Sequence, residues 1–120
     1  MAYDAGMLAV VLREISEACL GLRVEKIHQP TKDEVVLFMR GKKLSLNVGS
    51  VCPRISLTEI SKDNPASPPM FCMLLRKHLA GARIVGVSQI GFDRIADLTV
   101  SAYDEMGYKT NRHIICEIMG

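Results

Sequence analysis

The feature that most constrains the fold of this 120-residue chain is an internal repeat. Over positions 21–35, a shift of 60 residues aligns four identical pairs, which are Gly21/Gly81, Arg23/Arg83, Gln29/Gln89 and Asp33/Asp93. Three further pairs match in apolar character: Val24/Ile84, Ile27/Val87 and Val35/Ile95. Each copy has the order helix, glycine, strand, loop, strand, so the sequence predicts two related halves packed together.

The first half predicts one helix and four strands. Apolar residues from Met7 to Cys19 recur at the helical spacing of 3, 4 and 7 positions. Asp4 suits the N-cap of this helix, and Gly21 suits the left-handed residue that ends it. Strand-like stretches follow at 23–28, 33–40, 44–48 and 54–59, with Gly41-Lys42 as a tight hairpin turn.

The second half predicts one helix and three strands. Ser67 is expected to cap a helix that has Pro68 and Pro69 at its first positions, and Gly81 is expected to end it. Strands follow at 83–89, 94–102 and 112–119, with a turn at 104–107. The predicted fold is therefore α+β, with two helix-plus-antiparallel-strand halves that form a β-sandwich-like domain.

Charge and hydropathy exclude several classes of function. The chain carries 15 basic and 13 acidic side chains, a formal charge of +2, which is too weak to hold a polyanion by its overall field. Any nucleic-acid contact must therefore be local. No apolar run approaches the roughly 18 residues of a membrane span, and the first residues lack the basic segment of a secretory signal.

The four cysteines predict a cytoplasmic protein with free thiols. Cys19, Cys52, Cys72 and Cys116 include no C-x-x-C pair, so their spacing does not fit a zinc site or a disulfide framework. We expect buried free thiols in a reducing cytosol, no metal and no cofactor. No G-x-G-x-x-G motif, phosphate-binding loop or nucleophile elbow is present in the sequence either.

The repeat is most informative where it breaks. Asp33 is followed by Glu34, whereas Asp93 is followed by Arg94. A guanidinium beside a carboxylate can grip a phosphate or base edge while the carboxylate accepts from a 2′-hydroxyl. An ordinary ion pair at a loop–strand junction is the alternative, and the residues alone favour it.

Other polar residues have structural interpretations. Arg76, Lys77 and His78 fall near the end of the second helix, where cations complement the helix dipole, so a solvated face is favoured over an RNA-binding patch. His28 and His113 lie in strand-like stretches without partners at ligand spacing and are expected to be structural.

Several segments together resemble the NFACT family, also called the RqcH or "fibronectin-binding protein A" family. They are residues 1–7 (MAYDAGM), 23–30 (RVEKIHQP), 32–37 (KDEVVL), 53–58 (PRISLT), 64–79 (NPASPPMFCMLLRKHL) and 117–120 (EIMG). The likeness spans the whole chain in order. It identifies residues 1–120 as an NFACT amino-terminal domain, incomplete at its C-terminal end, because the chain stops directly after the apolar run at 114–119.

The resemblance implies a function in ribosome quality control. The complete protein would add helix-hairpin-helix, coiled-coil and RNA-binding modules. It would bind large ribosomal subunits obstructed by peptidyl-tRNA and recruit alanyl-tRNA, so that the stalled chain receives a C-terminal alanine tail. The family's functional residues fall on Asp4, Asp93 and Arg94, which are therefore expected to contact tRNA.

Two alternatives accompany this resemblance. The family's domain is similar to that of formamidopyrimidine-DNA glycosylases, but Ala2 and Tyr3 stand where those enzymes have a nucleophilic proline and a glutamate. We therefore expect no enzymatic activity. The family's older name implies a fibronectin-binding surface adhesin. The missing secretory segment and the cysteines weigh against that location, and fibronectin binding in vitro stays open.

Overall fold

A computed structural model describes residues 5–49, 54–59, 65–91 and 94–118. Within these residues the chain forms two helices and seven strands. They are α1 (Ala5–Cys19), β1 (Lys26–Thr31), β2 (Glu34–Met39), β3 (Lys42–Asn47), β4 (Arg54–Thr58), α2 (Met70–Leu79), β5 (Arg83–Gln89), β6 (Ile95–Tyr103) and β7 (Lys109–Glu117). Neither helix is long and apolar enough to cross a membrane.

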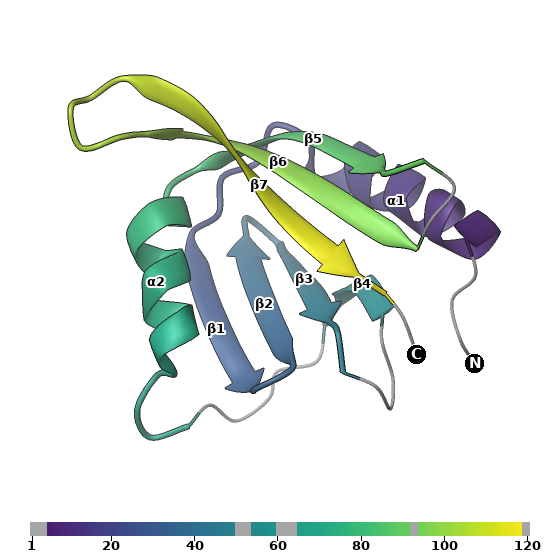
Figure 1. Cartoon of the computed structure of the whole chain (residues 1–120), viewed down its shortest axis with the longest axis horizontal. Coiled ribbons are helices and arrows are strands. Elements are labelled where there is room, and N and C mark those ends of the chain that lie inside the picture. The colour runs from purple at the N-terminus through teal and green to yellow at the C-terminus, as the bar shows by residue number, and fades with distance from the viewer. Residues whose placement is uncertain (1–4, 50–53, 60–64, 92–93, 119–120) are drawn as a thin grey trace.

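The strands form two antiparallel sheets, as the sequence predicts. One sheet has the order β1-β2-β3-β4 and the other has the order β5-β6-β7. Figure 1 shows the second sheet lying across the first, with α2 beside β1 and α1 beside β5. A single cluster of buried aliphatic side chains joins both sheets and both helices, and it includes Ile15, Leu37, Leu44, Leu79 and Leu98. The fold class is therefore confirmed as α+β.

The two halves meet at a joint with approximate twofold symmetry. Arg23 and Arg83, an identical pair of the repeat, face each other in an antiparallel bridge. Four backbone hydrogen bonds surround this bridge, and each has its counterpart in the other half. They run from Gly21 N to Ile84 O (2.7 Å) and Gly81 N to Val24 O (2.8 Å), and from Val24 N to Ala82 O (2.8 Å) and Ile84 N to Leu22 O (2.9 Å). This exchange confirms the repeat.

Each helix packs mainly on a strand of the opposite half. α1 contacts β5, and α2 contacts β1. The buried face of α1 consists of Leu8, Leu12, Ile15 and Cys19, which follow the predicted spacing. The halves are thus interlocked, because each contributes the helix that covers the other.

The start of α2 differs from the prediction. Its N-cap is Pro69, not Ser67, and no side chain caps it with a hydrogen bond. Pro69 has φ −58° and ψ 153°, which is an extended conformation, and the helix begins at the next residue, Met70. Two consecutive prolines keep the backbone extended up to the helix, so the serine lies too far upstream to reach the first free N–H groups. Asp4, the predicted cap of α1, lies outside the described residues.

The first strand is also displaced from its predicted position. The sequence predicts a strand at 23–28, but β1 begins at Lys26 and ends at Thr31. Arg23 and Val24 are extended, yet they bond to the second half instead of to β2. Pro30 lies within β1, which is tolerated because β1 is an edge strand of its sheet.

Candidate nucleic-acid interface

Of the three residues expected to contact tRNA, the structure describes Arg94. Asp4 and Asp93 lie outside the described residues. Arg94 directly precedes β6, and its carbonyl oxygen accepts a hydrogen bond from Ile118 N at 2.7 Å. The residue is half-buried, so it is not enclosed in the core. The contact of Arg94 with tRNA stays a prediction.

Three chain segments meet at the end of the molecule that carries Arg94. Gln89 Nε2, at the end of β5, donates to Ala5 O at 3.0 Å, which ties the start of α1 to this strand. Ile90 N donates to Ile95 O at 3.0 Å and closes the connection from β5 to β6. The start of α1 and this connection thus lie together (Figure 1), although Ala5 and Gln89 are far apart in sequence.

The end of β7 lies at the same place. Ile95 is paired with Glu117 in the ladder of β6 and β7. Glu117 and Ile118 belong to one of the segments that carry the family resemblance, and Arg94 belongs to the predicted Asp-Arg unit. The fold therefore brings these two distant segments side by side.

The basic end of α2 is more tightly organised than its sequence indicates. Arg76, Lys77 and His78 are exposed, as predicted. Arg76 Nε also donates to Ile27 O at 2.9 Å, on the edge of β1. Arg112 Nη1 contacts His78 Nδ1 at 2.5 Å and the His78 carbonyl at 3.4 Å. This end of α2 is therefore fixed to both sheets.

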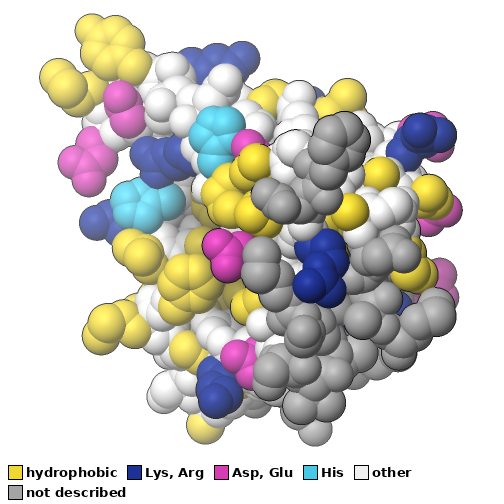
Figure 2. Space-filling view, turned by 45° about the vertical axis from the view of Figure 1, so that its right-hand side comes forward, with side chains coloured by type: hydrophobic (Ala, Val, Ile, Leu, Met, Phe, Trp, Pro, Cys, Tyr) yellow, Lys and Arg dark blue, Asp and Glu magenta, His cyan; other side chains and the backbone are white. Residues whose placement is uncertain are grey.

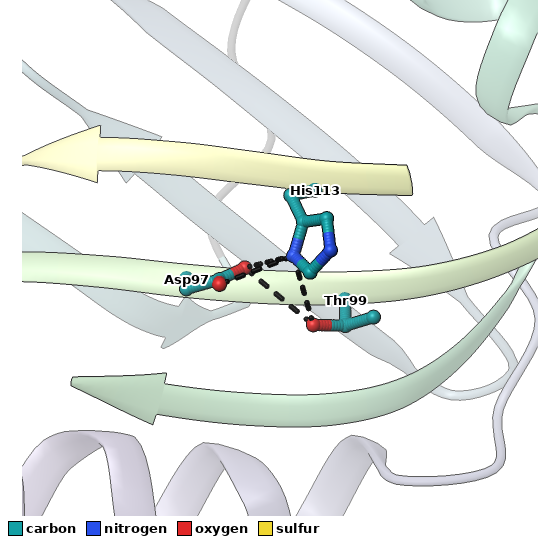
Figure 3. A network of polar contacts seen from close by, with 3 residues as sticks. All are labelled: Asp97, Thr99 and His113. Carbon is teal, nitrogen blue, oxygen red and sulfur yellow. Dashed lines mark hydrogen bonds and ion pairs between the residues drawn. The ribbon is translucent and has the colours of Figure 1, made fainter. Parts of the chain in front are cut away.

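A polar network that the sequence analysis missed lies on the sheet formed by β5, β6 and β7 (Figure 3). His113 Nδ1 lies 2.9 Å and 3.1 Å from the two carboxylate oxygens of Asp97 and 3.2 Å from Thr99 Oγ1. The side chain of His113 is 53% exposed, and that of Asp97 is 18% exposed. Thr99 and His113 are direct cross-strand partners. The sequence could not supply this pairing: a symmetric turn at 104–107 places Arg112 opposite Thr99, whereas the observed register pairs Tyr103 with Lys109 and so brings His113 there.

The geometry of this network differs from that of a catalytic triad. In a triad the nucleophile and the carboxylate contact opposite nitrogens of the histidine. Here the hydroxyl of Thr99 and the carboxylate of Asp97 contact the same nitrogen, and Figure 3 shows the other nitrogen pointing away from both. The arrangement orients the ring, and it does not activate Thr99.

Other chemistry-bearing groups are buried or unclustered. Among the residues that the structure describes, no group of three His, Cys, Asp or Glu side chains is placed to hold a metal ion. Cys19, Cys72 and Cys116 are buried free thiols, as predicted, whereas Cys52 lies outside the described residues. Burial raises the pKa of Cys116 to about 11. Burial also raises the pKa of Cys19, and the nearby Lys42 partly opposes that effect.

The solved structures that this chain is similar to share its fold closely. The N-terminal domain of fibronectin-binding protein PavA from Streptococcus pneumoniae is 37% identical, with a TM-score of 0.93 over 99% of this chain and 48% of that chain. The N-terminal part of the fibronectin/fibrinogen-binding protein from Streptococcus suis is 38% identical, with a TM-score of 0.94 over 99% of this chain and 46% of that one.

Characterised relatives are similar over most of the chain. The Rqc2 homolog RqcH of Bacillus subtilis is 39% identical over all of this chain, which spans 22% of that protein. The human ribosome quality control complex subunit NEMF is 32% identical over 92% of this chain and 10% of its own length. This chain therefore spans about a fifth of the bacterial relative's length and a tenth of the human one's. The family model for the NFACT N-terminal and middle domains matches residues 4–120, and the chain belongs to this family.

Proposed function

We propose that this chain is the amino-terminal domain of a non-enzymatic, RNA-binding factor of ribosome quality control. The factor binds obstructed large ribosomal subunits that carry peptidyl-tRNA and recruits alanyl-tRNA for C-terminal alanine tailing. The observation that carries this proposal is family membership over residues 4–120, together with relatives named RqcH and NEMF. The ribosome performs peptide transfer, and this domain positions RNA by phosphate, base and shape contacts.

The site proposed for tRNA is the end of the molecule at which Arg94 lies. The arginine there is half-buried, and Ile118 N donates a hydrogen bond to its carbonyl oxygen. A guanidinium on a fixed backbone loses less conformational freedom when it forms two parallel hydrogen bonds to a phosphate or base edge. Asp93, its neighbour in sequence, would supply an acceptor for a 2′-hydroxyl or an exocyclic amine, and Asp4 precedes Ala5, which is tied to the same end.

The proposal is tested by Arg94→Ala in the full-length protein. We expect loss of alanine tailing on obstructed subunits, with subunit binding largely retained because the other modules carry most of that contact. Arg40→Ala is the matched control, since Arg40 is exposed on the β2–β3 turn. Tailing is measured by the mass of the released nascent chain. Unchanged tailing in an Asp93→Ala/Arg94→Ala double variant removes this site assignment.

A second candidate function is supported by the names of the proteins whose solved structures are similar to this chain. Both name binding to fibronectin, and one also names fibrinogen. A surface adhesin requires the native protein to be outside the cell. Cell fractionation separates the two candidates: the first requires co-sedimentation with ribosomal subunits, and the second requires recovery with the cell surface.

A further inference from the structure

The two halves of the repeat differ by one strand. The first half has a helix followed by β1, β2, β3 and β4, whereas the second half, within the described residues, has a helix followed by β5, β6 and β7. The strands correspond in order, so β5, β6 and β7 are the counterparts of β1, β2 and β3. Strand β4 therefore has no counterpart in the part of the chain that the structure describes.

The outer edge of β7 presents backbone groups that suit a further strand. Ile118 N donates to Arg94 O, so these two residues form a hydrogen-bonded pair of the ladder between β6 and β7. Hydrogen-bonded and non-hydrogen-bonded pairs alternate along an antiparallel ladder. The N–H groups of His113, Ile115 and Glu117 therefore point away from β6, toward an edge with which no described strand pairs. Such an edge is a template for strand addition.

An apolar groove of about 130 Å³ adjoins β7. It lies between α2, β7 and the first sheet, and its lining includes Val48, Phe71, Leu75 and Ile114. Leu75 and Ile114 pack against the hydrophobic core, whereas Val48 is 46% exposed and Phe71 is 54% exposed. Figure 2 shows hydrophobic side chains gathered over α2, on the left-hand side of the view. Exposed apolar side chains that border a core are typical of a surface that another segment covers.

The first half shows which element fills the equivalent place. There β4 pairs with β3 and also contacts α1, and its Ile55 is fully buried in the core. The approximate twofold symmetry of the joint relates α1 to α2 and β3 to β7. A strand paired with the outer edge of β7 would therefore lie against α2, in the groove, as β4 lies against α1.

The similar solved domains are long enough to supply such a strand. This chain covers 48% of the PavA N-terminal domain and 46% of the Streptococcus suis one, so each of those domains is about twice as long as this chain. In the first half, the six residues 48–53 separate β3 from β4. A segment after residue 120 would need only an equally short connection, because antiparallel neighbours require no crossover.

We propose that the groove holds an eighth strand, supplied by the segment that follows residue 120 in the full-length protein. This strand pairs antiparallel with the outer edge of β7 and places apolar side chains between Val48 and Phe71. It gives the second sheet four strands, as in the first. Its connection to β7 starts beside Arg94, because Ile118 bonds to that residue, and it therefore lies next to the site proposed for tRNA. This inference does not depend on the proposed function.

Amide hydrogen exchange in the full-length protein tests the strand pairing. We expect the N–H groups of His113 and Ile115 to exchange at least about 100-fold more slowly than in the urea-unfolded chain, because a paired edge is protected. Mass spectrometry with electron-transfer fragmentation resolves single residues. The N–H groups of Ile114 and Cys116, which point toward β6, are the matched control and are protected with or without an eighth strand. Exchange of His113 and Ile115 at the unfolded rate overturns the proposal.

Site-specific photocrosslinking identifies the segment that fills the groove. The photoreactive residue p-benzoylphenylalanine replaces Phe71 in one variant of the full-length protein, and Tyr103, exposed elsewhere on the domain, in the control. We expect position 71 to crosslink within about 15 residues after residue 120, the length of a short connection plus one strand, and position 103 not to crosslink there. A crosslink from position 71 to a distant module or to another molecule, or none at all, overturns the proposal. Alanine tailing is a separate readout, so this proposal and the proposed function fail independently.

Discussion

The surroundings of His28 oppose the positive charge of its ring. Its ring packs against Phe38 with centroids 4.7 Å apart. Burial lowers the pKa of His28 from its ordinary value of 6.5, and the positive charges of Arg76 and Lys26 lower it further. The sequence analysis treated this histidine as structural, and its packing against Phe38 agrees with that interpretation.

The lowered pKa of His28 predicts a pH dependence of stability. Because the folded state holds the imidazole proton less tightly than the unfolded state, the free energy of unfolding falls as pH drops through about 6.5, and this loss levels off below the folded pKa. His28→Gln removes the proton and should make the stability curve flatter between pH 7.5 and 5. Urea unfolding of wild type and variant at these two pH values measures the difference. Parallel curves for the two proteins would contradict the assignment.

Cys116 illustrates how burial controls thiol chemistry. It is 4% exposed, and its pKa is raised to about 11, so at pH 8 only about a thousandth of it is thiolate. We expect iodoacetamide to alkylate Cys116 in the native domain at least about 100-fold more slowly than in urea-unfolded chain. Peptide mass spectrometry resolves the rate for each cysteine. Equal alkylation rates in the native and unfolded states would show that the Cys116 thiol is accessible to the reagent in the folded domain.

At the scale of elements, the two helix-ending glycines support the symmetric joint. Gly21 and Gly81 have φ +88° and +82°, and a Cβ added at either meets no atom within 4 Å. An alanine at either position therefore meets no steric clash, and its only cost is the conformational energy of a left-handed backbone. Each also donates its N–H to the opposite half, so the backbone there cannot relax without loss of a hydrogen bond.

Gly21→Ala and Gly81→Ala should each lower the free energy of unfolding by about 1–2 kcal/mol. Gly86→Ala is the matched control. Gly86 has no positive φ, and its added Cβ would lie 3.4 Å from Thr99 Cβ, an ordinary contact. We expect the control to be within about 0.5 kcal/mol of wild type. Chemical denaturation measures all three, and a strong asymmetry between the two glycine variants would argue against equivalent roles in the joint.

The elements show which parts of this fold follow from sequence. Local signals succeeded: the amphipathic face of α1, the glycine stops, the strand at Arg83–Gln89 and the turn that begins at Asp104 are where the pattern places them. One error was local, because two prolines keep the chain extended up to Met70 and Ser67 therefore does not cap α2. The other arose where a distant segment decides the pairing. Strand β1 starts late because Arg23 pairs with Arg83 across the molecule, and no local pattern contains that information.

The candidate site also has one part that the sequence predicts and another part that depends on contacts between distant segments. The break in the repeat at Arg94 can be read from residues alone, but the approach of Glu117 and Ile118 to it depends on the register of β6 and β7. The pairing of Asp97 with His113 also depends on that register. The role of Arg94 in tRNA binding came from family resemblance, and it stays a prediction.

At the scale of the whole molecule, the weak overall charge limits what any one surface of the domain can bind by itself. The domain measures 42 × 33 × 24 Å, and the Arg94 end and the β6–β7 turn lie at opposite ends of the nine-residue strand β6. A formal charge of +2 gives no long-range attraction strong enough to hold RNA unaided. Orientation by a second contact therefore matters more for this domain than for a strongly basic one.

This balance of charge predicts how the isolated 120-residue chain binds tRNA. Each phosphate contact contributes a slope of about −0.7 to −0.9 in a plot of log affinity against log salt. With one arginine as the main predicted contact, the isolated chain should bind weakly, with a slope equivalent to about one or two phosphates, whereas the full-length protein should bind more tightly with a steeper slope. Titrations at 50 and 200 mM salt measure both slopes, and Arg94→Ala should reduce each slope by about one phosphate contact. Equal affinity and slope for the isolated chain and the full-length protein would mean that this domain alone carries the RNA contact, and the expectation that the other modules contribute most of the binding would then be wrong.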